Sequence, residues 1–279
     1  MTTEEGKYDK RNKLNDLTGK EWLKLTKSFW ISEKCKDDKV AMKHPAPFMV
    51  KDTKKLISMF TKKGMKVFDP FLGSGTTIVA AVMLERKGYG IDLNEDYIYL
   101  CTQRFNDLKL SSDDYKIFNG DSSQKIDEFD DEFFDYIVTS PPYHNILKNK
   151  ASGIRSDNSN KGYRNGARQG IEYYSDNKKD LGNQDTFNDF LRLLSKIMAK
   201  CFKKLKKGKY CTIIISDFTV NKKEVCVQSY IVKMMEKIGF EFVGTTILLQ
   251  NNKPLYPFGY PFAYKINHHH QNIITFRKN

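Results

Sequence analysis

The feature that most constrains the fold is a Gly-rich loop placed between an apolar strand and an apolar helix. Residues 66–68 (KVF) have the composition of a buried strand, residues 69–75 (DPFLGSG) form the loop, and residues 76–86 begin an apolar helix. Two glycines in three residues permit a tight turn in which the backbone approaches a ligand closely. The loop lacks the GK(S/T) ending of a phosphate-binding loop and the third glycine of GxGxxG, so the pattern does not favour an NTPase or a simple dinucleotide site.

Strands and helices alternate along the rest of the chain. This alternation predicts an α/β fold with a doubly wound, mostly parallel sheet of about seven strands, in which ligands bind beyond the carboxyl ends of the strands. The predicted helices are 21–29, 48–60, 76–86, 95–106, 187–205 and 225–238, and the predicted strands are 66–68, 88–91, 115–118, 133–138, part of 206–218, 241–249 and 272–277.

Polar segments follow four of these strands: DPFLGSGTT, IDLNED, NGDSS and TSPPY. The helix after the Gly-rich loop offers free backbone N–H groups to a carboxylate, while Asp69 suits an ammonium group. Asp92 is placed to bind a ribose diol, and Asp121 to reach an adenine amino group. A single acid of this kind is more often a turn residue or a helix cap. The ordered set predicts S-adenosylmethionine as the cofactor.

The segment TSPPY ends a predicted buried strand at residues 139–143. Two prolines remove two ladder donors, so an ordinary strand terminator is one interpretation. The other is a catalytic turn in which Ser140 Oγ and the Pro141 carbonyl accept hydrogen bonds from an exocyclic amino group. Tyr143 is then expected to face outward and to stack on a base flipped out of its duplex.

DPFLGSGTT and TSPPY together resemble the cofactor loop and the (D/N/S)PP(Y/F) signature of the S-adenosylmethionine-dependent amino-methyltransferases of DNA, and KHPAPF resembles the segment before that loop. The resemblance covers residues 40–250 and implies a Rossmann-like class I methyltransferase fold. The catalytic residues that it implies are Ser140, Pro141, Pro142 and Tyr143. The cofactor-binding residues are His44, Pro45, Phe48, Asp69, Pro70, Phe71, Gly73, Ser74, Gly75, Thr76, Thr77, Asp92, Leu93, Asp121 and Ser122.

The order of the two motifs and the residue before PPY bear on the subclass. Many members of the family carry the catalytic motif first, whereas here the cofactor loop precedes TSPPY. Serine before PPY resembles the cytosine-N4 enzymes, while DPPY is commoner among adenine-N6 enzymes. We therefore predict a site-specific cytosine-N4 DNA methyltransferase, with adenine N6 as the alternative. An RNA or tRNA base methyltransferase and a degenerate, non-enzymatic DNA-binding fold are the other two alternatives.

Residues 144–185 are poor in core residues, and we predict a DNA-recognition insertion there within a methyltransferase domain of residues 41–279, which follows an N-terminal extension of residues 1–40. A solvated loop is the alternative. A net charge of +13 is consistent with double-stranded DNA as the partner, although a Lys-rich proteome would give the same balance. The predicted DNA-binding residues are Lys148, Lys150, Arg155, Lys161, Arg164 and Arg168.

The remaining features concern location and partners. Five scattered cysteines, a polar N-terminus and the lack of an apolar run of roughly 18 residues predict a cytoplasmic protein with no membrane segment. A cognate restriction endonuclease is an expected partner in the cell. No metal is expected, and for His268–His270 we prefer a DNA-facing or structural role. Asp217 is assigned either to the target pocket or to a turn.

Overall fold

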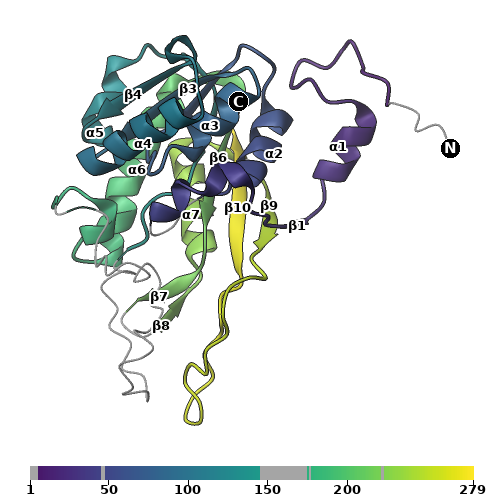
Figure 1. The fold of residues 1–279 in the computed structure, drawn as a ribbon. Helices are drawn as coiled ribbons and strands as arrows, with labels where there is room; N and C mark the ends of the chain where they lie inside the picture. The colour runs from purple at the N-terminus through teal and green to yellow at the C-terminus, as the bar shows by residue number, and fades with distance from the viewer. Residues whose placement is uncertain (1–5, 45–47, 145–174, 176, 221–222) are drawn as a thin grey trace.

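The computed structural model describes residues 6–44, 48–144, 175, 177–220 and 223–279, and an eight-stranded sheet forms its centre (Figure 1). Among the described strands of this sheet, β10 alone runs antiparallel to its neighbours, so the predicted doubly wound, mostly parallel α/β sheet is confirmed. In spatial order the strands are β1 (Phe29–Ile31), β9 (Glu241–Leu249), β10 (His270–Arg277), β6 (Leu205–Ile215), β5 (Phe134–Thr139), β2 (Lys66–Asp69), β3 (Lys87–Asp92) and β4 (Tyr115–Asn119).

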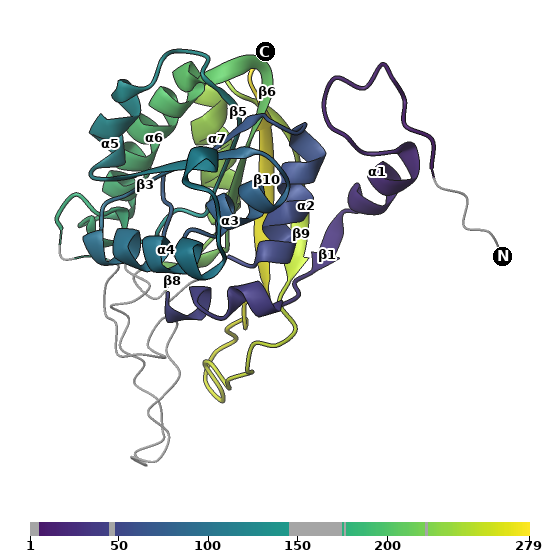
Figure 2. The ribbon, with the colours of Figure 1, turned by 45° about the horizontal axis from the view of Figure 1, so that its top comes forward.

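Helices cover both faces of the sheet, as Figures 1 and 2 show. On one face α6 and α7 pack Phe190, Leu194 and Met235 against the sheet, and on the other α2 and α3 pack Ile57 and Ala80. The helix bounds are α1 (Gly19–Leu25), α2 (Val50–Phe60), α3 (Thr76–Met83), α4 (Glu95–Asp107), α5 (Ser122–Lys125), α6 (Phe187–Lys204) and α7 (Val227–Ile238), and β7 (Phe218–Val220) pairs with β8 (Lys223–Val225) in a small separate sheet.

The edge strand β1 corrects the prediction of a helix at residues 21–29. Helix α1 starts at a capping box of Thr18 and Glu21 and ends at Leu25. Phe29 then belongs to β1, where it is half exposed, while Trp30 is buried. The pattern exposed–buried–exposed has the period of a strand, and β1 pairs in parallel with β9. The spacing of Trp22, Leu25 and Phe29 by three and four residues is typical of one helix face, but the helix ends at Leu25 and Phe29 lies on a strand.

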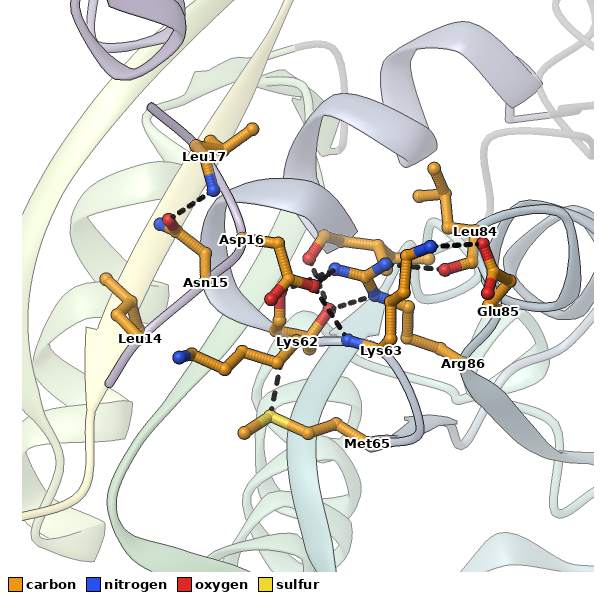
Figure 3. A network of polar contacts seen from close by, with 12 residues as sticks. Leu14, Asn15, Asp16, Leu17, Lys62, Lys63, Met65, Leu84, Glu85 and Arg86 are labelled. Carbon is orange, nitrogen blue, oxygen red and sulfur yellow. Dashed lines mark hydrogen bonds and ion pairs between the residues drawn. The ribbon is translucent and has the colours of Figure 1, made fainter. Parts of the chain in front are cut away.

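Asn15 and Asp16 dock beside the residues that lead into β2 and β3, at the amino-terminal ends of these strands and opposite the carboxyl edge of the sheet. Figure 3 shows the polar contacts. The buried Arg86 guanidinium donates to the Thr61 carbonyl at 2.7 Å and pairs with Asp16 at 3.0 Å. The Lys63 backbone N–H also donates to Asp16, at 2.8 Å. Asn15 is buried and donates to the Met59 carbonyl at 2.7 Å. These contacts fix Asn15 and Asp16 to the end of α2 and to the connections α2–β2 and α3–β3.

In the described part of the chain, no helix combines the length and the apolar character that crossing a bilayer requires.

Candidate functional site

A pocket opens at the carboxyl ends of β2, β3, β4 and β5, where the four polar segments of the sequence meet. Strands β2 and β5 are neighbours in the sheet although β3 and β4 lie between them in the chain, so the pocket lies where the strand order reverses. The predicted residues that line it are His44, Pro70, Phe71, Gly73, Asp92, Leu93, Asp121, Ser122, Ser140, Pro141, Pro142 and Tyr143.

The Gly-rich loop needs glycine at both positions. Gly73 and Gly75 have φ angles of 52° and 78°, in the left-handed region that side chains disfavour. A Cβ on Gly75 would lie 2.7 Å from the Phe105 ring, and one on Gly73 would lie 3.1 Å from His44 Nε2. His44 also contacts the Tyr97 ring, with centroids 4.6 Å apart. The loop is thus held between the core behind it and His44 in front of it.

Asp69 lies beneath the loop and is not among the residues that line the pocket. Its carboxylate accepts hydrogen bonds from the hydroxyls of Thr77 and Thr139, both at 2.6 Å, and from the Phe71 N–H at 3.0 Å. Burial raises its pKa, and these donors act in the opposite direction. Three donors leave few of the four lone-pair positions of a carboxylate for a ligand. The observed contacts are those of a residue that ties the loop to the end of β5, and binding of an ammonium group stays a prediction.

Asp92 ends β3 and faces the pocket. One carboxylate oxygen accepts from the Gly73 N–H at 2.6 Å and the other from the Asn94 N–H at 2.9 Å. Each oxygen keeps a lone pair, so the carboxylate can still accept two hydroxyl groups. Burial, reinforced by the charges of Asp180 and Asp69, raises the pKa of Asp92 to about 7, against the effect of the two N–H donors.

Asp121 and Ser122 follow β4 at the third corner of the pocket. Asp121 caps α5 by accepting from the Ser123 N–H at 2.8 Å, and it pairs with Lys179 at 3.5 Å. The Ser122 hydroxyl donates to the Pro70 carbonyl at 2.5 Å. The acid therefore serves as a helix cap and also lines the pocket, so the two interpretations of a lone acid at this position are compatible.

The segment TSPPY leaves β5 directly beside the Gly-rich loop. Thr139 donates a hydrogen bond to Asp69, so the SPPY turn is joined to the start of the Gly-rich loop. Tyr143 is 9% exposed, and its hydroxyl accepts from the Ser216 N–H and from Gln271 Nε2, both at 2.9 Å. Its ring stacks on Phe218 with centroids 5.6 Å apart. The expectation that Tyr143 faces outward is wrong, because its hydroxyl finds its donors at the ends of β6 and β10.

Several predicted residues support the loop without lining the pocket. Phe48 is partly buried and packs against the core, and its carbonyl accepts from the Thr76 hydroxyl at 3.1 Å. Ser74 and Thr76 both bind the guanidinium of Arg104, which the sequence did not single out. Pro45 and the six predicted DNA-binding residues, Lys148, Lys150, Arg155, Lys161, Arg164 and Arg168, lie outside the described residues.

Six further pocket residues were missed: Asn94, Tyr97, Lys179, Asp180, Leu181 and Ile197. Three of them lie in the predicted DNA-recognition insertion, whose last part folds back onto the pocket. Asp180 accepts from the Ser175 hydroxyl at 2.6 Å and from the Gly182 N–H at 2.8 Å, which fixes a short turn there. An Asp two residues before a Gly is a sequence signal for such a turn.

The weaker sequence signals lie away from the pocket. Asp217 accepts from the Gln228 N–H at 3.1 Å, so it acts at the start of α7. His268 Nε2 lies 2.9 Å from Glu224 on β8. Among the residues that the structure describes, no three His, Cys, Asp or Glu side chains gather in a group able to hold a metal ion.

Comparison with known proteins identifies the family. A family model described as DNA methylase, N6_N4 methyltransferase, matches residues 2–103 and 134–279. The chain is 37% identical over 98 residues to the Type II methyltransferase M2.DpnII of Streptococcus pneumoniae. The aligned region covers 35% of this chain and 34% of that protein. It is 31% identical over 83 residues to a tRNA (guanine(10)-N2)-dimethyltransferase of Pyrococcus abyssi, covering 30% and 25%. The alignments thus span about a quarter to a third of these relatives.

The solved structure of TrmN from Thermus thermophilus has the same fold. The two chains superpose with a TM-score of 0.52 at 15% identity, over 88% of this chain and 52% of that one. This protein belongs to the N6_N4 DNA methylase family and has the class I methyltransferase fold, as predicted. S-adenosylmethionine is its cofactor, and the pocket fits that molecule: a glycine loop that tolerates no Cβ, a carboxylate with two open lone pairs, and a second acid beyond β4.

Proposed function

We propose that this protein is a site-specific DNA methyltransferase that methylates the exocyclic amino group of a flipped base, with cytosine N4 as the favoured position. The observation that carries the proposal is the joining of two motifs in one pocket. The Gly-rich loop after β2 and the SPPY turn after β5 both line it, and the bond between Asp69 and Thr139 fixes their spacing.

The cofactor supplies, when bound, an electrophilic methyl group on a sulfonium. The chain's part is to bind, orient and activate the amino group, whose lone pair is conjugated into the base. Ser140 Oγ and the Pro141 carbonyl accept hydrogen bonds from the two N–H groups of this amino group. These hydrogen bonds favour a tetrahedral nitrogen with an available lone pair. Pro141 and Pro142 fix the turn and present no N–H donor to compete. Positioning of this kind accounts for much of the barrier lowering expected in such a transfer.

Tyr143 supplies the wall against which the flipped base packs. Its ring is held on one side by Phe218, and its hydroxyl is fixed by Ser216 and Gln271, so it offers a rigid surface to the pocket. A stacking partner compensates for part of the stacking that a base loses when it leaves the duplex. A fixed ring does this at little cost in side-chain entropy.

The choice between cytosine N4 and adenine N6 rests on the residue before PPY. Ser140 is the feature that supports cytosine, because serine at this position resembles the cytosine-N4 enzymes. Adenine N6 uses the same acceptor pair and remains the alternative. A tRNA base is the second candidate substrate, and the relative in Pyrococcus abyssi favours it.

The expected partners follow from a DNA substrate. Double-stranded DNA is the proposed partner, and the basic side chains at 148–168 are proposed to contact it. A cognate restriction endonuclease and a cytoplasmic location stay predictions that rest on the sequence.

A comparison of two variants tests this division of roles. Ser140→Ala should lower methyl transfer to DNA by about a hundredfold or more, because the amino group loses an acceptor, while the dissociation constant for S-adenosylmethionine stays close to the wild-type value. Asp92→Ala should raise that dissociation constant. Isothermal titration with the cofactor and transfer of a labelled methyl group give both quantities. Equal loss of cofactor affinity in the two variants would contradict the proposal.

A further inference from the structure

The chain between β9 and β10 forms a long projecting arm, residues 250–269, which we call the aromatic hairpin. Leu249 and His270 pair at its root, where the two strands reach the carboxyl edge of the sheet. Figures 1 and 2 both show the arm extending below the body of the molecule, beyond the ends of β9 and β10. The arm therefore projects from the same edge that carries the pocket.

The hairpin exposes large apolar side chains that it has no core to bury. Phe262 is 91% exposed, Tyr264 is 90% exposed, and Leu255 and Tyr260 are each 76% exposed. Exposed single apolar residues are common, but several neighbouring rings on one arm mark a surface that binds a partner.

Hydrogen bonds define the shape of the arm. The Asn267 side chain accepts from the Tyr256 N–H at 3.0 Å and donates to the Tyr256 carbonyl at 2.8 Å, so it holds the two sides of the arm together. At the tip, the Gly259 carbonyl accepts from the N–H groups of Phe262 and Ala263 at 2.8 and 2.7 Å. The exposed rings are therefore presented by a defined turn.

The charge around these rings has one sign. Residues 242–279 contain no Asp or Glu, and their cationic side chains are Lys253, Lys265, Arg277 and Lys278. Lys253 and Lys265 lie on the arm itself and are exposed. A partner for this surface should therefore combine negative charge with flat faces on which aromatic rings stack, and nucleic acid has both properties.

The root of the hairpin is bonded to the catalytic turn. Gln271 donates to the Tyr143 hydroxyl at 2.9 Å, and the Ser216 hydroxyl donates to the His270 carbonyl at 2.9 Å. His268 lies 2.9 Å from Glu224, which connects the arm to the sheet of β7 and β8. A partner that binds the arm is thereby placed in a fixed relation to the wall of the base pocket.

We propose that the aromatic hairpin is a second DNA-contact surface, whose exposed rings stack on or insert between bases beside the target base while Lys253 and Lys265 meet the phosphates. The inference rests on the proposed DNA substrate. Insertion of apolar side chains at base steps unstacks and bends a duplex, and this eases the extrusion of a neighbouring base. The hairpin then helps to present the base that Tyr143 receives.

The first test uses fluorescence anisotropy to measure the dissociation constants of the wild type and of two variants for a fluorescein-labelled duplex of random genomic sequence. The double variant F262S/Y264S should raise the dissociation constant by at least about tenfold, because two stacking side chains are removed. Its melting temperature and its affinity for S-adenosylmethionine should match those of the wild type. Leu23→Ser on α1 is the matched control, because Leu23 is 72% exposed, and it should leave DNA binding unchanged. Wild-type DNA affinity in the double variant would overturn the inference.

A second test reports contact directly. In Phe262→Trp, added duplex should quench the fluorescence of the new tryptophan, with the wild type, which has Trp22 and Trp30, as the baseline. Bound DNA without additional quenching would contradict the inference. Sedimentation of the wild type and the double variant tests whether a second copy of the chain binds the hairpin instead of DNA. Loss of a dimer in the variant, with DNA affinity retained, would assign the hairpin to contact between two copies.

Methyl transfer measured on the same samples separates the two proposals. Transfer to DNA by the wild type and equally by F262S/Y264S would leave the proposed function standing and overturn the hairpin inference. Transfer to tRNA with none to DNA would overturn both.

Discussion

At the scale of single residues, Asp92 predicts a pH-dependent affinity for the cofactor. Hydroxyl donors stabilise the charged carboxylate, so a proton and the cofactor compete for it. Because the pKa of Asp92 is about 7 without ligand, the dissociation constant for S-adenosylmethionine should rise about tenfold between pH 8 and pH 6. Isothermal titration across that range measures it. Asp92→Asn should flatten the profile, and an unchanged affinity in the wild type would contradict the prediction.

The same pKa predicts the sign of a stability change. The pKa of Asp92 is higher in the folded protein than the ordinary value of 3.8, so the folded state binds the proton more tightly than the unfolded state. The contribution of Asp92 to the free energy of unfolding without ligand therefore falls as the pH rises from about 4 to about 7. Bound cofactor should reduce this fall, because it stabilises the charged form.

The predictability of the site also differs from residue to residue. The pocket positions of Gly73, Asp92 and Asp121 follow from local spacing, since each lies at the end of a strand or shortly after it, and these strand ends meet at one edge. The burial of Tyr143 did not follow, because its partners Ser216 and Gln271 lie 73 and 128 residues away in the chain. The hydrogen bond from Thr139 to Asp69 could not be predicted for the same reason, since the two residues lie 70 positions apart in the chain.

At the scale of elements, the docking of Asp16 onto the connections α2–β2 and α3–β3 predicts a large effect of one buried arginine. Arg86→Met should lower the free energy of unfolding by about 2 to 4 kcal/mol, because the Thr61 carbonyl and Asp16 lose a shared donor (Figure 3). Urea denaturation measures the loss. Arg11→Met removes a fully exposed pair with Asp9 and should leave the stability unchanged. Equal stability of both variants would show that the docking contributes nothing.

The accuracy of the predicted helix and strand bounds depends on how many residues carry the apolar pattern. The long helices and the buried strands were predicted to within a few residues, because their apolar periods are clear. Strand β1 was missed, since three residues are too few to show a period of two and the neighbouring α1 supplied a competing helical spacing. Its place at the edge depends on β9, which lies more than 200 residues further along the chain.

At the scale of the whole molecule, the features of interest gather at one edge of the sheet. The pocket, the SPPY turn and the aromatic hairpin all belong to the carboxyl edge, while Asn15 and Asp16 dock at the opposite one. A net charge of +13, with no acid after Glu241, is suited to a polyanion that lies across that edge. The sequence predicted the sheet and the edge at which its polar segments meet, and the aromatic residues of 253–264 suggested a recognition segment or a pocket wall. That this segment projects from the sheet with its rings exposed emerged only from the structure.

The measurement that tests the central claim most directly is the identity of the methylated nucleoside. The protein is incubated with labelled S-adenosylmethionine and either unmethylated genomic DNA or bulk tRNA, and the digested nucleosides are separated and identified by mass spectrometry. We expect label in DNA as N4-methylcytosine, lowered by about a hundredfold or more with Ser140→Ala. N6-methyladenine would keep the site and change the base. Label in tRNA alone, or none in either polymer with cofactor bound, would contradict the claim that this is a DNA methyltransferase.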